Sequence, residues 1–375
     1  MFRAHTFILI IFVSNIIIAQ DTILYPPKLN KEIIQNRIDS LNKLTSIELD
    51  WNENVYRYIK YYLTQRREQV ARMMSLSSYY FPIFEEHLDK YDLPFEIKFL
   101  PIIESGLNPH AKSPVGATGI WQFMHATAKE YNLRINSYLD ERKDIYKSTE
   151  AACQYLEKSY KQFNDWHLAL ASYNAGRRNI KKAIIRSGGQ MNFWAISPFL
   201  PGETSKYIPS FIAAVYVMTF AEQHGIRPDK NYILNNEPLD SLKIDRAVKI
   251  AHLAHTLGIE EDKIQRLNPS YRIQIIPELE GEKFPIILPE YKVDLFLQKR
   301  DQFLNTIDSL VLLESEEYPE YTDIRRTIHI VRSGDVLGRI ANKYNCSIKD
   351  IMAWNKLNST KIMLGQRLKI FQLIN

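Results

Sequence analysis

A single glutamate, Glu104, stands where an apolar run ends, and its position favours acid–base chemistry. Pro94 suits the first turn of a helix, on which Ile97 and Leu100 share one face with the glutamate. Apolar neighbours and a place near the helix C-terminus both disfavour negative charge, so we expect the pKa of Glu104 to be raised. A carboxylic acid that stays protonated near neutral pH can act as a general acid. The alternative is a surface glutamate at a helix end, and Pro101 is expected to kink the helix just before it.

The residues that follow the glutamate suit a pocket for a bulky polar substrate. Gly116 and Gly119 permit close approach of the backbone. Gln122 offers an amide that can read an acetamido group. Trp121 or Tyr173 offers an aromatic face for a sugar ring.

Two further clusters of small and polar residues lie downstream. Residues 172–176 (SYNAG) end a predicted helix, and residues 201–209 (PGETSKYIP) form the second cluster. The alternative for Asn174 is a role in a helix cap, and the alternative for Tyr207 is a core aromatic.

The order of these motifs resembles that of the lytic transglycosylases of the soluble-type, lysozyme-like superfamily, and within it the membrane-bound lytic murein transglycosylase D group. The family's Glu-Ser motif matches residues 104–105, and its Gly-Leu-Met-Gln motif matches residues 119–122 (GIWQ), where this group commonly has Trp at the third place. Its Ala-Tyr-Asn motif matches residues 172–174, with Ser in place of Ala, and its late tyrosine matches Tyr207. The resemblance covers residues 90–225 and implies a mainly α, goose-type lysozyme-like catalytic domain.

The resemblance implies a peptidoglycan lytic transglycosylase, a carbon–oxygen lyase. Such an enzyme cleaves the β-1,4 bond between N-acetylmuramic acid and N-acetylglucosamine and forms 1,6-anhydromuramyl ends. Glu104 would then be the catalytic acid and base. The substrate-binding and supporting residues that the resemblance implies are Ser105, Gln122, Tyr173, Asn174 and Tyr207. The implied partner is the glycan strand of peptidoglycan, and no cofactor is implied.

Two alternatives stay open. A goose-type lysozyme would hydrolyse the same bond, and Glu203 is the candidate for the second carboxylate that such a hydrolase uses. A non-catalytic peptidoglycan-binding protein is the other alternative, and the intact set of motif residues argues against it. His252 and His255 lie beside Glu260 but lack an evident third ligand, so we expect no metal.

The elements that must position these motifs are predicted to be helical. From residue 92 to 225, helical patterns are interrupted by Gly, Pro and Asn without an alternating strand pattern, which is typical of a compact α domain. Upstream, Tyr56, Ile59 and Leu63 fall on one face of a predicted helix. The stretch 225–228 (GIRP) marks the end of the α domain.

A segment of the C-terminal part is repeated. Leu253 recurs as Ile340 and Asn268 as Asn355, both 87 positions later. Each copy is predicted to contain two short helices, an Asn and a closing strand. The second copy includes residues 329–335 (HIVRSGD) and resembles a LysM module, a small βααβ fold that binds N-acetylglucosamine-containing glycans. The first copy lacks the Ser-Gly-Asp sequence and resembles a degenerate LysM module, for which glycan binding stays open.

The strands expected in the two copies are residues 284–288, 327–331 and 367–370. Residues 291–311 are predicted to form an amphipathic linker helix, and residues 314–320 are acidic and expected to be loose. The expected divisions of the chain are a signal peptide at 1–20, N-terminal helices at 21–90, a catalytic domain at 91–230, a degenerate repeat at 243–290, a linker helix at 291–325 and a LysM domain at 326–372.

The N-terminus is typical of an exported protein. Arg3 precedes a short apolar run, residues 7–18, and the sequence turns polar at Gln20. A membrane span needs about 20 apolar residues, so we expect a cleaved signal and a place in the periplasm or cell envelope. No cysteine lies near the cleavage site, so a lipoprotein is not expected. The two cysteines, Cys153 and Cys346, are expected in separate domains and unpaired.

Composition bounds the remaining possibilities. The chain has 375 residues, of which 45% are hydrophobic, which suits two or three domains with real cores. The net charge of +5 fits an acidic polymer as partner, but the dense basic stripe of a nucleic-acid binder is missing. No later stretch is long and apolar enough for a stable transmembrane anchor.

Overall fold

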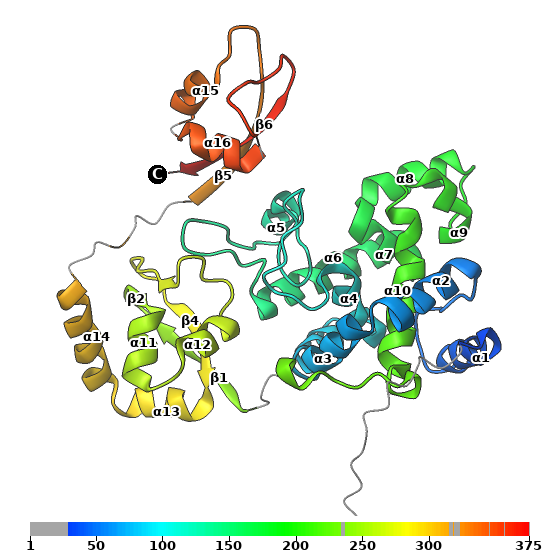
Figure 1. Ribbon diagram of the computed structural model, residues 1–375, viewed down its shortest axis with the longest axis horizontal. Helices are drawn as coiled ribbons and strands as arrows, with labels where there is room; N and C mark the ends of the chain where they lie inside the picture. Colours follow the sequence, from blue (N-terminus) through cyan, green and yellow to red (C-terminus); the bar gives the residue numbers. More distant parts are fainter. Residues whose placement is uncertain are drawn as a thin grey trace, which may run out of the picture.

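The structure, a computed structural model, contains three hydrophobic cores (Figure 1). The structure describes residues 29–233, 237–314, 318, 323–344, 346–355 and 357–374. The expected signal peptide and most of the acidic stretch at 314–320 lie outside the described residues. Within the described residues, no helix combines the length and the apolar character needed to cross a membrane.

The first core extends from Ile34 to Ile226 and is built by helices, as expected for this part of the chain. In chain order, with η for 3₁₀ helices, these are α1 (Lys31–Leu41), α2 (Glu53–Gln65), α3 (Arg67–Lys90), η1 (Phe95–Phe99), α4 (Leu100–Ser105), α5 (His125–Glu130), α6 (Ile145–Phe163), α7 (Trp166–Ala175), α8 (Arg177–Arg186), α9 (Phe193–Ile196), η2 (Ser197–Phe199), η3 (Thr204–Lys206), α10 (Tyr207–Phe220), η4 (Glu222–His224) and η5 (Lys230–Tyr232). Helix α10 is buried along most of its length and packs against α2, α4 and α7.

Short polar side chains fix where several of these helices begin. Side-chain oxygens accept hydrogen bonds from the N-terminal backbone N–H groups of α1, α2, α6, α7 and α9. The capping residues are, in order, Asn30, Asn52, Asp144, Asp165 and Asn192. A cap of this kind satisfies donors that a helix cannot bond internally and is worth about 1 kcal/mol.

The helix expected to start beside Pro94 and carry Glu104 is wrong as a single α-helix. The chain forms η1 first and then starts α4 at Leu100. Pro101 therefore lies in the first turn of α4, where a missing N–H costs nothing, and it does not kink the interior of a longer helix.

The second core belongs to the first repeat, hereafter the inner module. Its elements are β1 (Leu239–Ile244), β2 (Val248–Lys249), α11 (Ile250–Leu257), α12 (Glu261–Leu267), β3 (Ile275–Ile276), β4 (Phe284–Pro289), α13 (Glu290–Gln298) and α14 (Arg300–Glu314). β1 and β4 pair antiparallel, and β2 pairs with β3. The closing strand is confirmed as β4, whereas β1 was not expected.

The single linker helix expected at 291–311 is also wrong. The segment forms two helices, α13 and α14, that bury Phe296 and Ile307 in the core of the inner module. Their apolar residues therefore complete a core and do not serve as a spacer between modules.

The third core belongs to the second repeat, hereafter the outer module. It contains β5 (Asp323–Ile330), α15 (Leu337–Lys343), α16 (Ile348–Asn355) and β6 (Arg367–Ile374), and β5 pairs antiparallel with β6. Both expected strands are confirmed. Cys346 lies in this module and Cys153 in the first core, and both thiols are free, as expected.

Candidate active site

Glu104 occupies the last turn of α4, which ends at Gly106 in a left-handed conformation. The buried side chains of Leu100 and Ile102 precede it on this short helix. Burial raises the pKa of Glu104 to about 7, and the nearby charge of Glu203 adds a smaller rise. A hydrogen bond from Tyr207 opposes these effects only in part. The expected raised pKa is confirmed, and burial is its main cause.

Tyr207 directly contacts the candidate acid. Its hydroxyl donates a hydrogen bond to Oε1 of Glu104. Burial and the nearby glutamate hold the pKa of Tyr207 well above its ordinary value, so the phenol remains a donor. Tyr207 is thus a buried aromatic at the start of α10 and also a partner of the carboxyl group, which reconciles the two interpretations from the sequence.

Ser105 joins the end of α4 to the loop that follows it. Its hydroxyl donates to the carbonyl oxygen of Ile120 at 2.8 Å and accepts the backbone N–H of Asn108 at 3.2 Å. Ser105 therefore fixes the position of the neighbouring Glu104 through the backbone.

Residues 106–124, hereafter the catalytic loop, hold Gln122 by backbone contacts. The Nε2 of Gln122 donates to the carbonyl oxygens of Gly119 at 2.7 Å and Ala111 at 3.2 Å. Gln122 has a φ of 51°, and Gly119 has a φ of 90°. A Cβ at Gly119 would lie 1.8 Å from the carbonyl oxygen of Arg142, so the close backbone approach excludes any side chain there.

Trp121 cannot offer a face to a sugar, which corrects one of the two aromatic assignments. Its side chain is 0% exposed, lies edge-on to Phe84, and donates from Nε1 to Thr149 Oγ1 at 2.8 Å. Tyr173 is partly exposed, and its hydroxyl donates to the carbonyl oxygen of Trp121 at 2.8 Å. Burial and the charge of Glu104 hold the pKa of Tyr173 well above its ordinary value.

Asn174 lies on the last turn of α7, which ends at Gly176. Its Oδ1 accepts a hydrogen bond from Thr204 Oγ1 at 2.7 Å, and this contact joins α7 to η3. Glu203, immediately before Thr204, is exposed.

The structure thus separates the predicted site residues by their contacts. Tyr207 bonds to Glu104, and Tyr173 lies close enough for the two groups to influence each other's charge. Ser105 and Gln122 bond to backbone carbonyls of the surrounding loop, and Asn174 bonds to the side chain of Thr204. Sequence reasoning missed Arg142, whose backbone packs against Gly119.

Two cavities lie apart from Glu104. One of about 390 Å³ lies between the first core and the inner module and includes Asp144 and Asn268 in its lining. Asp144 caps α6 and Asn268 bonds to backbone of the inner module, so both have structural roles. The other, of about 520 Å³, is lined by paired charges such as Arg134 and Glu141. Among the described residues, no group of three or more side chains is suited to hold a metal ion.

Comparison with known families divides the chain in three places. The transglycosylase SLT domain matches residues 81–193. The LysM-like domain of lytic transglycosylase MltD matches residues 238–304, and the LysM domain matches residues 329–371. These matches cover Glu104 and the catalytic loop, the inner module and the outer module.

Relatives with curated descriptions include two lytic murein transglycosylases. The membrane-bound lytic murein transglycosylase D of Escherichia coli (strain K12) is 31% identical over 288 residues, which are 75% of this chain and 61% of the relative. The chain therefore spans 61% of the length of that protein. The soluble lytic murein transglycosylase of Escherichia coli (strain K12) is 32% identical over 116 residues, or 29% of this chain and 18% of the relative. A solved complex of the 70-kDa soluble lytic transglycosylase with bulgecin A has 25% identity and a TM-score of 0.34, and it covers 43% of this chain and 26% of that one.

Proposed function

We propose that this chain, which matches the SLT domain and two LysM-type domains of lytic transglycosylases, cleaves the glycan strands of peptidoglycan. The bond is the β-1,4 linkage between N-acetylmuramic acid and N-acetylglucosamine, and the product carries a 1,6-anhydromuramyl end. The observation that carries the proposal is the single carboxyl group of Glu104, whose pKa is raised to about 7 in contact with a protonated tyrosine. Such a group can give up a proton and take one back near neutral pH.

The reaction needs one acid and no water. Protonated Glu104 donates its proton to the glycosidic oxygen, and the bond from that oxygen to the muramyl C1 breaks. The resulting carboxylate then accepts the proton of the muramyl C6 hydroxyl while that oxygen bonds to C1. The proton lost in the first step is recovered in the second, so Glu104 ends as it began.

Tyr207 assists this cycle through its hydrogen bond to Glu104. Because the phenol donates, it favours the carboxylate formed after the first step and keeps the carboxyl group in one orientation. Gln122 and Asn174 would contact the sugars from the catalytic loop and α7, and Tyr173 would flank the developing positive charge at C1. These roles follow the family motifs that the residues occupy.

We assign the outer module to the binding of glycan strands, so that the catalytic domain is held at an insoluble substrate.

We also propose that residues 1–20 direct export to the periplasm or cell envelope, because the short apolar run and the polar break have the form of a signal peptide. Sequencing the N-terminus of the native protein checks this proposal, and retention of Met1 contradicts it.

Digestion of purified sacculi, followed by mass spectrometry of the muropeptides, tests the reaction itself. The proposal expects 1,6-anhydromuramyl ends. Reducing ends would identify a goose-type lysozyme, with Glu203 as the candidate second carboxylate. Binding to sacculi without release of any product would identify a non-catalytic binding protein.

A further inference from the structure

The inner module is bonded to the catalytic domain by a loop that sequence reasoning left without a role. Residues 134–142, hereafter the docking loop, pair with the segment after α12 in the manner of a short antiparallel bridge between Leu139 and Tyr271. The N–H of Asp140 donates to the Ser270 carbonyl oxygen at 2.9 Å. The N–H of Arg272 donates to the carbonyl oxygen of Tyr138 at 2.7 Å.

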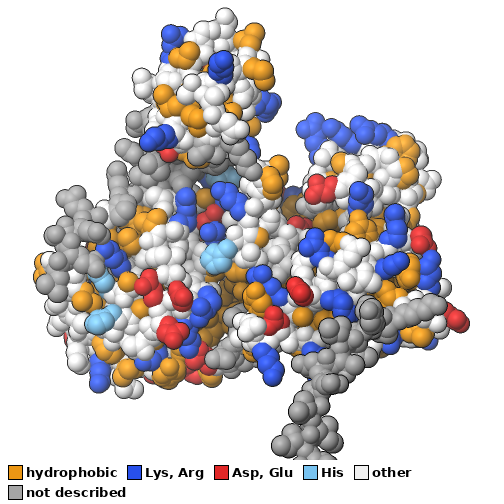
Figure 2. Space-filling model, in the orientation of Figure 1, with side chains coloured by type: hydrophobic (Ala, Val, Ile, Leu, Met, Phe, Trp, Pro, Cys, Tyr) orange, Lys and Arg blue, Asp and Glu red, His pale blue; other side chains and the backbone are white. Residues whose placement is uncertain are grey.

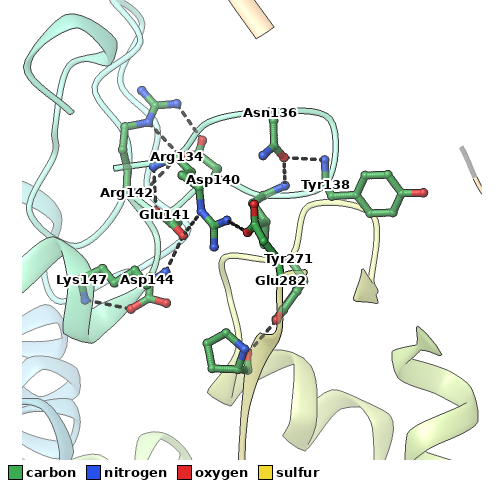
Figure 3. Close-up of polar contacts among 12 residues, drawn as sticks. Arg134, Asn136, Tyr138, Asp140, Glu141, Arg142, Asp144, Lys147, Tyr271 and Glu282 are labelled. Atoms are coloured by element: carbon green, nitrogen blue, oxygen red, sulfur yellow. Dashed lines mark hydrogen bonds and ion pairs between the residues drawn. The ribbon is translucent and has the colours of Figure 1, made fainter. Parts of the chain in front are cut away.

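Side chains seal the same contact. The guanidinium of Arg272 donates to the carbonyl oxygen of Asn136 in the docking loop. Tyr138 and Leu139 of the docking loop are buried within the core of the inner module, together with Tyr271. Backbone pairing combined with a shared apolar core is typical of a fixed interface within one folded unit. The inner module is therefore docked, and Figure 3 shows residues of the docking loop beside Tyr271 and Glu282 of the inner module.

The charged side chains of the docking loop are paired. Asp140 and Arg142 are both buried and form a two-pronged ion pair, with Nε to Oδ1 at 2.8 Å and Nη2 to Oδ2 at 2.7 Å. Buried Glu141 accepts the backbone N–H of Arg134 at 2.7 Å and its Nε at 2.9 Å. Paired, hydrogen-bonded charges of this kind hold one geometry.

From the docking loop, Arg142 reaches into the catalytic loop. Its Nη1 donates to the carbonyl oxygen of Gly116 at 3.0 Å and to that of Phe123 at 3.4 Å. These two carbonyls lie on either side of Gln122, and the carbonyl oxygen of Arg142 itself lies against Gly119. One arginine thus contacts the catalytic loop at three points.

We propose that the inner module is a clamp for the catalytic loop, and that Arg142 is the positioning residue through which it acts. The path runs from Arg272 to the docking loop, then through Asp140 and Arg142 to the backbone around Gln122. The inference rests on the proposed function only for its effect on turnover. It gives the inner module a role in the reaction, because the segment after α12 is bonded to the docking loop.

The physical reason for a clamp lies in the structure of the catalytic loop. It contains no helix between α4 and α5 and relies on isolated hydrogen bonds, such as Thr118 N–H to the Phe123 carbonyl at 3.1 Å. A shift of about 1 Å in a positioning group can cost about 10²-fold in rate. Support from a docked module therefore bears on the geometry of Gln122 and, through Ile120 and Ser105, of the catalytic acid.

Hydrogen–deuterium exchange on the full-length chain tests the clamp without reference to the reaction. Arg272→Ala removes the side-chain contact to Asn136 and is expected to speed exchange in residues 116–123 by about tenfold. Arg266→Ala is the matched control, because Arg266 is exposed on α12 of the same module, and it should leave exchange unchanged. Arg272→Lys, which keeps a donor, should restore part of the protection.

Turnover of the same variants provides the second measurement. Arg272→Ala should lower kcat on sacculi by about tenfold, while cosedimentation with sacculi stays at the wild-type level. If residues 116–123 of the Arg272→Ala variant exchange at the wild-type rate, the clamp is overturned, whether or not the N–H of Asp140 becomes exposed. A wild-type protein that releases no anhydromuramyl product would instead overturn the proposed function and leave the exchange result standing.

Discussion

The inner and outer modules share one set of hydrogen bonds, hereafter the latch, made by Asn268 in the inner module and Asn355 in the outer module. In the inner module, the Nδ2 of Asn268 donates to the carbonyl oxygens of Ile264 and Ile287, and its Oδ1 accepts the N–H of Ile287 at 2.7 Å. In the outer module, Asn355 makes the same three bonds to Ile351 and Lys369, with the accepted N–H also at 2.7 Å. Each Asn joins the second helix of its module to the closing strand.

Away from the latch, polar residues of the outer module are replaced by apolar ones in the inner module. The outer module has a network in which His329 bonds to Asp335 at 2.8 Å and to the hydroxyl of Tyr344 at 3.1 Å. The positions 87 residues earlier are occupied by Leu242, Val248 and Leu257, all of them buried. The inner module has therefore exchanged a polar network for additional core.

The surfaces of the two modules differ in the same direction. After α12 the inner module buries Ser270 and Tyr271 against the docking loop. After α16 the outer module leaves Met363 and Leu364 about three-quarters exposed, at 74% and 75%. Figure 2 shows the outer module, at the top, with apolar side chains on its surface. The comparison teaches that one scaffold is docked against the first domain in one copy and leaves apolar side chains exposed in the other.

The largest expected effect comes from removing the chemistry while keeping the binding surface. Glu104→Gln preserves size and removes the transferable proton, so release of anhydromuropeptides should fall by at least about 100-fold. Sacculus binding by the outer module should be retained. Mass spectrometry of the released muropeptides and a cosedimentation assay measure the two effects.

Glu203→Gln is the control for that variant, because Glu203 is the nearby carboxylate that the proposed reaction does not use. It should reduce release far less than Glu104→Gln. Loss of turnover in Glu203→Gln with activity kept in Glu104→Gln would show that the acid is wrongly assigned.

The next effect distinguishes the modules by their latches. Asn268→Ala and Asn355→Ala each leave buried backbone groups unpaired, at a cost of about 1–3 kcal/mol per group. Because the inner module is docked, Asn268→Ala should lower kcat and leave sacculus binding intact. Asn355→Ala should weaken sacculus binding and leave kcat on soluble fragments intact. If both variants lost kcat and sacculus binding to the same extent, the proposed difference between the two modules would be contradicted.

Deletion of the outer module should have a moderate and selective effect. A chain ending before Arg325 should cosediment with insoluble peptidoglycan about tenfold more weakly, because a tether raises the effective concentration of substrate. Cleavage of short soluble glycan fragments should stay near the wild-type rate. An equal loss in both assays would mean that the outer module belongs to the catalytic fold.

The smallest expected effect is the response of the outer module to low pH. The N–H of Arg332 and the side chain of His329 hold the pKa of Asp335 below its ordinary value. A carboxylate with a lowered pKa stabilises the folded state above its ordinary pKa, and this contribution is lost as the pH falls through the folded value. The outer module should therefore loosen below about pH 4, whereas Val248 gives the inner module no such response. Amide exchange followed module by module against pH checks this, and Asp335→Asn should flatten the outer module's response.

The sequence was most informative where local pattern determines structure. The helical domain, the closing strands and the raised pKa of Glu104 all follow from periodicity, turn residues and apolar neighbours. Trp121 shows the limit of this reasoning, because its type suits both a sugar platform and a core. Only its packing on Phe84 and its bond to Thr149 decide for the core.

The docking loop could not be found from local pattern. Residues 140–144 read as DERKD, a run typical of a solvated turn, and yet Asp140, Glu141 and Arg142 are buried. Their burial depends on pairing with each other and with a segment about 130 residues further along the chain. β1 was missed for the same reason, since its partner, β4, lies 40 or more residues away. An alignment of the two repeats offers one signal that the inner module differs in role, because the positions of the outer module's polar network are apolar in the inner module.

The raised pKa of Glu104 also has a consequence for the thermodynamics of folding. An ordinary glutamate has a pKa of 4.5, so between that value and about 7 the folded domain holds a proton that the unfolded chain has released. Folding at these pH values takes up a proton, and the free energy of unfolding declines by on the order of 3 kcal/mol as the pH rises through this range. The contribution is complete below pH 4.5 and lost above about 7. The proposed catalytic acid therefore weakens the fold once the pH rises above about 7, and Glu104→Gln, which cannot titrate, should unfold with less dependence on pH.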